Sequence, residues 1–273
     1  RAPARHRPAG APAGCEQPVV SEVVVIHYHG TPVGGSRIDA SRFLSGRHAL
    51  IPFFRPDDAA IAMEVCQSFV LDNSAYSLWK AGGDVPFAEY HSWVQGMAGH
   101  PGLDWCLIPD KIDGDEEHNV QLVTAWLREG SDVQSVPVWH LHESLEWLAY
   151  LVTHFQTVAL GSSGAYSTPG AAGWWWRMEK VMEVCCNSIG RPRCKLHGLR
   201  MLDPRIFTRL PLSSADSTNA AVNSGSLKRF GQYLPPTASQ RADVIAERIE
   251  AHNSAAAWVT DNLPQLDLFA LGG

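Results

Sequence analysis

The chain lacks any long hydrophobic run. None of its apolar stretches reaches the ~18–20 residues that a membrane-spanning helix needs, which argues against a membrane protein. Residues 1–20 (RAPARHRPAGAPAGCEQPVV) are rich in Pro, Ala and Arg and lack the apolar core of a signal peptide. We therefore expect residues 1–20 to be a disordered N-terminal extension, and residues 21–273 to form one domain.

An excess of basic residues is also missing. Asp and Glu outnumber Lys and Arg by 28 to 22, which gives a formal net charge of −6. A broad nucleic-acid surface usually carries a basic excess, so this composition argues against one but is compatible with a local basic patch. Cysteines are few, at 6 in the whole chain, and their spacing matches no standard structural-zinc pattern. We expect buried free thiols in a reducing, cytoplasmic setting.

What the chain does contain is a regular series of short apolar runs, separated by stretches that can be helical. Alternation of strands and helices indicates a parallel sheet. Eight such units in about 250 residues are typical of a (β/α)8 TIM barrel, an α/β fold. The sequence therefore predicts a single-domain TIM barrel with a C-terminal helix over Ala238–Trp258. The runs are Val23–His29, Ala49–Phe54, Phe69–Asp72, Trp105–Asp110, Val136–His142, Val158–Gly161, Lys195–Met201 and Leu212–Asp216.

Histidines close several of these runs, at the strand ends where TIM barrels place their active sites. Residues two apart on a strand share a face, so His27 and His29 point the same way, as do His140 and His142. With His197 from another strand end, these imidazoles have two interpretations. They either bind a divalent ion such as Zn²⁺ or line a polar pocket without metal. We predict the pocket without metal.

Carboxylates follow several runs as well. A lone Asp after a strand often only caps a helix, but Asp72 and Asp216 are surrounded by small polar residues such as Asn73. Two carboxylates at one barrel mouth can divide a nucleophilic role from an acid/base role when their environments separate their pKa values. We therefore predict Asp72 and Asp216 to be the catalytic pair, with Asp110 and Asp113 nearby.

A glycine-serine turn follows the sixth run. Glycine at a strand end lets the backbone approach a ligand closely, and the amide groups of such a turn can bind oxygen atoms. Arg200, after the seventh run, is a candidate contact for phosphate or carboxylate. The predicted substrate-binding residues are Asn73, Asp110, Asp113, His140, His142, Gly161, Ser162, Ser163, His197 and Arg200.

With these strand ends in order, the chain resembles the tRNA-guanine transglycosylase superfamily. It is most similar to the short phage and bacterial relatives that act in 7-deazaguanine modification. Leu71–Ser77 (LDNSAYS) stands where that family carries Asp-Ser-Gly-Gly-Phe-Gln, with Ser74 and Ala75 in the places of the glycines. Lys195–Leu199 resembles its strand leading into Gly-Val-Gly.

Other parts of the likeness concern the base and the nucleophile. Leu160–Gly164 resembles the family's Gly-Gly base-binding turn, and Ser214–Ser217 lies where its nucleophilic Asp follows the last strand. Asp110 and Asp113 lie where the family recognises the heterocycle. His140 or His142 would replace its Gln-Gly segment. The likeness covers residues 23–223 and is carried by the order of the motifs.

The resemblance implies glycosidic exchange. Asp216 would attack C1′ of a nucleoside unit and release guanine, leaving a covalent ribosyl or deoxyribosyl enzyme. Asp72 would then help an incoming 7-deazaguanine replace the lost base. This chemistry uses two carboxylates and requires neither metal nor cofactor. The implied partner is a nucleobase or nucleoside unit, either free or within DNA or tRNA, and an enzyme that only releases the base is compatible with the same residues.

Two other functions stay open. A metal-dependent, amidohydrolase-like barrel would use His27 and His29 with histidines of later strands and Asp216. Stoichiometric metal in the purified protein would distinguish it. A nucleotide-binding barrel without catalysis would keep its ligand after Asp216→Asn and form no covalent adduct.

Overall fold

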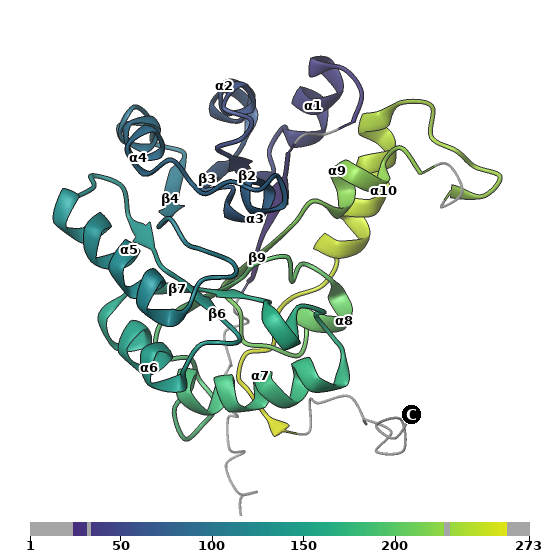
Figure 1. The fold of residues 1–273 in the computed structure, drawn as a ribbon. Helices are drawn as coiled ribbons and strands as arrows, with labels where there is room; N and C mark the ends of the chain where they lie inside the picture. Colours follow the sequence, from purple (N-terminus) through teal and green to yellow (C-terminus); the bar gives the residue numbers. More distant parts are fainter. Residues whose placement is uncertain (1–23, 32–33, 227–229, 261–273) are drawn as a thin grey trace, which may run out of the picture.

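The computed structural model describes residues 24–31, 34–226 and 230–260, so the predicted N-terminal extension over residues 1–20 lies outside the described residues. Strands alternate with helices along this part of the chain, and every strand pairing in the sheet is parallel. Figure 1 shows the helices as an outer layer around the strands. The predicted (β/α)8 TIM barrel is confirmed.

The strands form a ring of eight positions. The sheet order in the described part is β5-β4-β3-β2-β1-β9-β8-β7-β6. Because Pro137 has no N–H for the ladder, it divides one barrel strand into β5 and β6, and its carbonyl accepts a hydrogen bond from Ala159 at 2.9 Å. The segments are β1 (Ile26–Gly30), β2 (His48–Pro52), β3 (Ser68–Asp72), β4 (Leu103–Leu107), β5 (Ser135–Val136), β6 (Val138–His140), β7 (Thr157–Gly161), β8 (Lys195–Gly198) and β9 (Ser214–Ser217).

The helices cover the outside of this ring. The described helices are α1 (Arg37–Leu44), α2 (Asp57–Val65), α3 (Ala75–Lys80), α4 (Phe87–Gln95), α5 (Glu116–Glu129), α6 (Leu145–His154), α7 (Ala172–Cys185), α8 (Pro204–Phe207), α9 (Asn219–Asn223) and α10 (Ala238–Glu250), with a 3₁₀ turn at Gly164–Tyr166. The C-terminal helix is shorter than the predicted Ala238–Trp258. The chain leaves the helix after Glu250, and hydrogen bonds from Ala255 to the Leu210 carbonyl and from Trp258 to the Gly190 carbonyl hold it.

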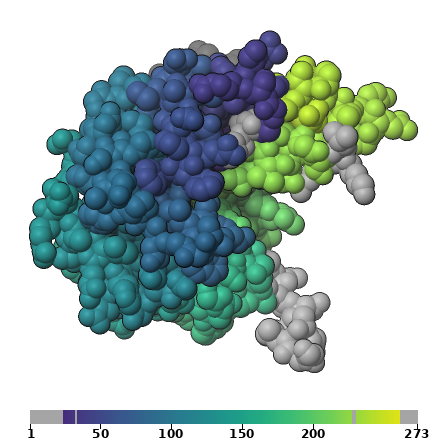
Figure 2. All heavy atoms as spheres, turned by 45° about the horizontal axis from the view of Figure 1, so that its top comes forward, coloured from purple at the N-terminus to yellow at the C-terminus, as the bar shows by residue number. Residues whose placement is uncertain are grey.

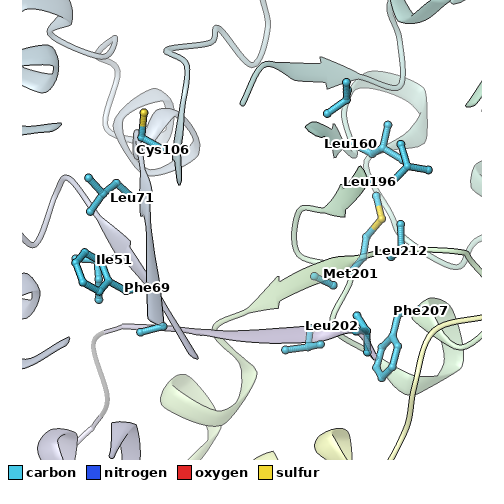
Figure 3. Close-up of a cluster of buried hydrophobic side chains, with 14 of the residues drawn as sticks. Ile51, Phe69, Leu71, Cys106, Leu160, Leu196, Met201, Leu202, Phe207 and Leu212 are labelled. Carbon is cyan, nitrogen blue, oxygen red and sulfur yellow. The ribbon is translucent and has the colours of Figure 1, made fainter. Parts of the chain in front are cut away.

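Along each strand, the side chains point alternately into the barrel interior and outward to the helices. Tyr28, Val70, Trp105, Val138 and Ala159 belong to the interior cluster. Their neighbours in the chain pack outward against the helices, and Figure 3 shows part of this outer core. Because both faces are buried, the strands appear in the sequence as continuous apolar runs. Burial of each such side chain contributes roughly 1.5–3 kcal/mol.

Helix α10 completes the outer layer next to α1, where Figure 2 shows its yellow-green atoms beside the purple atoms of α1. Arg47 joins the two regions through ion pairs with Asp243 at 2.7 Å and Glu250 at 3.0 Å. The strand-one histidines also point this way: His29 Nε2 lies 2.8 Å from Glu250 Oε1, and His27 Nε2 bonds a backbone carbonyl after α10. Both imidazoles therefore face outward.

The cysteines of the described residues are free thiols. Cys106 and Cys185 are buried, whereas Cys15 lies outside the described residues. Burial raises the pKa of the Cys106 thiol to about 12, so this side chain packs as a small apolar group. None of the helices in the described ranges has the length and apolarity required to cross a membrane.

One glycine fixes the position of the C-terminal segment. Gly190 has φ of +76°, and a Cβ there would lie 2.1 Å from the Trp258 carbonyl oxygen. We expect Gly190→Ala to lower the free energy of unfolding by roughly 1–3 kcal/mol, because the variant combines backbone strain with a steric clash. Chemical denaturation measures this effect.

Gly173→Ala is the matched control, because Gly173 lies in α7 with no atom within 4 Å of an added Cβ. We expect its stability to stay equal or rise slightly, as Ala favours helix over Gly. Equal stabilities for the two variants would contradict the assignment of Gly190.

Candidate active site

Inward-facing residues at the C-terminal ends of the strands meet at one barrel mouth. Val70 and Ala159 face the interior, so Asp72 and Gly161, two residues later on the same strands, face the same way. His140 of β6 is in register with Gly161 of β7. Asp216 of β9 is in register with the inward-facing Tyr28 of β1. The predicted catalytic pair and part of the predicted binding set therefore come together.

Two adjoining cavities open at this mouth. The inner cavity has a volume of about 200 Å³, and the outer one of about 800 Å³. Tyr76, Ile112, Ser162, Ser167 and Arg200 line both cavities, which makes them one continuous site. Predicted residues in the inner wall are Asn73, Asp110, His140, Gly161, Ser162 and Arg200. Predicted residues in the outer wall are Asp113, His142, Ser162, Ser163 and Arg200.

A buried polar network forms the floor of the inner cavity. Asp110, only 8% exposed, accepts a hydrogen bond from Asn73 at 2.7 Å on Oδ1 and one from His140 Nε2 at 2.8 Å on Oδ2. Glu143 accepts the His140 backbone N–H at 2.9 Å and the Asn119 amide at 2.7 Å. These contacts fix the imidazole ring from two sides.

Asp216, like Asp72, is in the wall of neither cavity. It is buried, with 5% of the residue exposed. The backbone N–H of Arg200 donates to its Oδ1 at 2.9 Å. His197 Nε2 approaches the same oxygen at 3.3 Å, while His197 Nδ1 contacts Ser214 Oγ at 2.8 Å. His197 is fully buried and is in the wall of neither cavity, so its contact is with Asp216.

Asp72 shows the largest electrostatic effect among the site's carboxyl groups. Burial raises the pKa of Asp72 to about 7, together with the nearby charges of Asp216 and Asp110, against a lowering contribution from a hydrogen bond of the Ser74 backbone. A like charge nearby disfavours ionisation. The three carboxyl groups therefore interact across one mouth, and Asp72 titrates near neutral pH.

Two cations flank an aromatic ring at the entrance. The Arg200 guanidinium lies 4.4 Å from the centre of the Tyr76 ring, and Lys80 Nζ lies 4.7 Å from it. Hydrogen bonds to Lys80 and then to Arg200 lower the pKa of the Tyr76 hydroxyl. Within the described ranges, no ion pair joins either cation to a carboxylate. This entrance can attract an anionic group.

The remaining predicted residues belong to the outer cavity. His142 is held by Ser163 Oγ at 2.7 Å and by the Gly114 carbonyl at 3.1 Å. Ser162 Oγ accepts a hydrogen bond from the Trp174 indole at 2.9 Å. Asp113 is exposed at the outer wall. The glycine-serine turn therefore lines both cavities, with Gly161 in the inner wall and Ser163 in the outer one.

Sequence reasoning missed several supporting residues. Glu143 and Asn119 are buried beside His140, yet their positions in the chain give no sign of this, because the contact depends on how α5 docks. Arg177 is, like Arg200, an arginine that the sequence offers as a candidate contact for phosphate or carboxylate, but it donates to the carbonyls of Leu141 and Glu143 and so supports the turn after β6. Tyr76 lies within the Leu71–Ser77 segment, shortly after the predicted Asp72, and this position was the available signal. Its contact with Arg200 is seen only in the structure.

The histidines considered for a metal site do not converge. His27 and His29 face α10, whereas His140 and His142 belong to the barrel mouth, so these pairs point to different places. Within the described part of the chain, no group of three or more His, Cys, Asp or Glu side chains is placed to hold a metal ion. The strand-one histidines and the histidines of the barrel mouth therefore do not share one site.

The coupling between carboxyl groups is directly testable. We expect the Asp72 carboxyl to titrate with a pKa of about 7 and Asp216→Asn to lower that pKa, because the variant removes a like charge. Carboxyl ¹³C chemical shifts followed across the pH range measure both values. Asp132→Asn, an exposed site outside the cavity walls, should change neither. An Asp72 that titrates at its ordinary value of about 3.9 in the parent protein contradicts the arrangement.

Comparisons with known proteins address the fold. No family model matches this chain, and no curated protein matches it significantly. A solved structure from a structural study of Aquifex aeolicus VF5 is 10% identical, with a TM-score of 0.50 over 85% of this chain and 95% of that one. The YdjI aldolase of Escherichia coli K12 is 10% identical, with a TM-score of 0.46 over 84% and 90% of the two chains. A mutant tryptophan synthase alpha-subunit of Pyrococcus furiosus is 12% identical, with a TM-score of 0.43 over 84% and 97%. At such low identity the similarity to the Aquifex aeolicus structure shows the fold alone, a single-domain TIM barrel.

Proposed function

We propose that this protein is a transglycosylase-like enzyme that acts at the N-glycosidic bond of a nucleoside unit. It exchanges or releases a purine, guanine or a 7-deazaguanine, through an Asp nucleophile, in the manner of the short relatives of tRNA-guanine transglycosylase. One observation carries the proposal: Asp72, Asp110 and Asp216 interact at one barrel mouth, where the pKa of Asp72 rises to about 7. Two carboxyl groups held in different environments suit divided nucleophilic and acid/base roles.

Asp216 suits the nucleophilic role. The Arg200 N–H and the buried His197 hold its carboxylate in one orientation. A carboxylate so placed stabilises the positive charge that develops at C1′ and can form an ester bond with it. Asp72 suits the proton-transfer role, because a group that titrates near 7 accepts and releases protons readily at neutral pH. It would take the N9 proton of the incoming base.

Backbone conformation supports the resemblance independently of side chains. Ser74 and Arg200 are the non-glycine residues with positive φ in the described chain, at 63° and 58°. Ser74 stands in the place of a glycine of the family's Gly-Gly after the catalytic Asp. The left-handed region favours glycine, so the conformation at Ser74 is one that a glycine of that pattern would adopt readily.

The cavities suit the two parts of a nucleotide. The inner cavity, about 200 Å³ in volume, has polar side chains at its floor that can pair with the edge of a heterocycle. The larger outer cavity carries Lys80 and Arg200 at its wall, and these cations can contact phosphate oxygens. We place the base in the inner cavity, the phosphate in the outer one, and the sugar between them beside Arg200, whose backbone N–H contacts Asp216.

Removal of either catalytic carboxylate should abolish the reaction. We expect Asp216→Ala and Asp72→Ala each to reduce base release and exchange by ~10³-fold or more without unfolding the chain. Exchange of labelled guanine into DNA, tRNA and free nucleosides measures the activity. Intact mass spectrometry should detect a sugar adduct on the parent protein and none on Asp216→Ala. Asp132→Asn is the control with a carboxylate removed elsewhere.

The same measurements separate the alternatives. An active Asp216→Ala enzyme would refute the nucleophile. Nucleotide binding by the parent protein with neither adduct nor turnover would support a non-catalytic binding barrel. Stoichiometric metal, lost together with activity, would support the metal-dependent hydrolase.

The cationic entrance gives a further prediction. We expect Arg200→Gln to raise KM for a phosphorylated substrate about 10-fold, because a charge-assisted hydrogen bond is lost. The variant keeps the backbone N–H that orients Asp216, so kcat should change much less. Arg205→Gln is the control, since Arg205 is exposed and paired with Asp203. An unchanged KM for nucleotide and oligonucleotide substrates would contradict the phosphate contact.

A further inference from the structure

We propose that His140 donates a proton through Nδ1 to N7 of the departing purine, and that Asp110 acts through His140 and has no direct contact with the heterocycle. This inference rests on the proposed function and specifies how that site releases its base. It adds a proton donor to the two carboxylates already assigned. It also gives Asp110 a positioning role.

The Nδ1 atom of His140 is the first observation. His140 is 2% exposed and lines the inner cavity. Its Nδ1 is buried and has no hydrogen-bond partner. An unpaired buried polar atom costs about 1–3 kcal/mol, so it is expected where a ligand supplies the missing partner. Nδ1 is thus available to a base in this cavity.

The rest of the ring is held in place. Nε2 donates to Asp110 Oδ2 at 2.8 Å, and Asp110 Oδ1 is occupied by the Asn73 amide. The His140 backbone N–H is held by Glu143. With Nε2 directed at a carboxylate, Nδ1 is the nitrogen left to face a ligand. The carboxylate of Asp110 has a partner on each oxygen, which leaves the imidazole as the better placed group for the heterocycle.

Gly161 leaves space beside this nitrogen. It lines the same cavity, and a Cβ built on it would lie 3.1 Å from His140 Nδ1. A ligand atom cannot occupy that point, which is at bonding distance from Gly161 Cα, but the missing side chain leaves the approach to Nδ1 open on this side. Alanine at this position would fill the space with a methyl group.

The surrounding charges favour a protonated imidazole. Burial lowers the pKa of His140, but the hydrogen bond and charge of Asp110 and the charge of Glu143 outweigh it, so that the pKa lies above its usual value. His142, the other titratable group nearby, has its ring 5.7 Å from that of His140. Gly161 of β7 lies beside the ring and does not titrate. Asp72, at the end of β3, interacts electrostatically with Asp110, the partner of His140.

The step balances. The Nδ1 proton of the imidazolium moves to guanine N7 while the C1′–N9 bond breaks, and its electron pair stays on N9. Guanine leaves as a neutral tautomer, and an Asp216 oxygen forms the bond to C1′. His140 is left neutral and regains a proton from water. A 7-deazaguanine has carbon at position 7 and cannot accept this proton, so the donor distinguishes the outgoing base from the incoming one.

The test uses a leaving group that needs no proton. Matched DNA and RNA oligonucleotides carry either guanine or 7-methylguanine at one position; the second base already bears a positive charge and leaves without protonation. We expect His140→Gln to slow release of guanine about 100-fold or more and release of 7-methylguanine less than about 3-fold. His154→Gln, an exposed imidazole on α6, is the control. Thermal unfolding of each variant verifies the fold.

Each outcome decides the proposal. Equal losses on the two substrates, or no loss on guanine, overturn the proton-donor role while the proposed function stands. If the parent protein releases neither base, the proposed function fails and this inference fails with it. Gly161→Ala provides a second variant that keeps the imidazole. It should slow release of guanine, since its methyl group would lie beside Nδ1, and unchanged release of guanine would contradict the placement of N7 at this nitrogen.

Asp110→Asn tests the positioning role. The protonated donor is active below its pKa, so the rate with guanine falls as pH rises through that value. Removal of the Asp110 charge lowers the pKa of His140 and should move this decline to lower pH by about one unit or more. The rate with 7-methylguanine should show no such shift. An unmoved decline means that Asp110 does not act through His140.

Discussion

Three carboxyl groups crowded into one barrel mouth are the constraint on which the rest of the site depends. Different neighbours stabilise the negative charge of each carboxylate. Asp110 accepts hydrogen bonds from Asn73 and His140, and Asp216 accepts one from the Arg200 backbone with His197 beside it. Asp72 has only the Ser74 backbone to favour its ionised form, so its pKa rises to about 7. A buried carboxyl group with little to stabilise its charge keeps its proton to higher pH, and on this ground the proposed function gives Asp72 the proton-transfer role.

Backbone geometry and electrostatics are linked at the same places. Ser74, two residues after Asp72, and Arg200, whose N–H binds Asp216, both adopt left-handed conformations. Such a conformation at a non-glycine residue costs on the order of 1–3 kcal/mol and persists only where the surroundings enforce it. The parallel strands on either side and the buried carboxylates provide that enforcement. Arginine at position 200 also places a guanidinium beside Tyr76 at the cavity entrance, which glycine could not do.

The barrel and much of its mouth could be predicted from the sequence, because both depend on patterns within short segments of the chain. Apolar runs identify strands buried on both faces, and the residues that follow them must lie at the C-terminal end of the sheet. That His27 and His29 share a face also follows from the strand period, but which face they share depends on the exact start of β1. The strand begins at Ile26, so Tyr28 points inward and the histidines point outward. Helix α1 also has a local signal, because Ser36 and Asp39 form a capping box at its start. The Glu143–Asn119 contact depends on docking between distant segments, for which one sequence contains no local signal.

Charge balance connects the proposed steps into one reaction. Before base release, the mouth would hold a positive imidazolium at His140 and a negative carboxylate at Asp216. When the base leaves, His140 loses its positive charge as Asp216 loses its negative charge on forming an ester. The net charge of the protein groups is therefore the same on both sides of the step, which matters because creating net charge in a water-excluded site is costly. The fixed carboxylates of Asp110 and Glu143 remain near the imidazole throughout. They favour its reprotonation and so prepare the site for the next base.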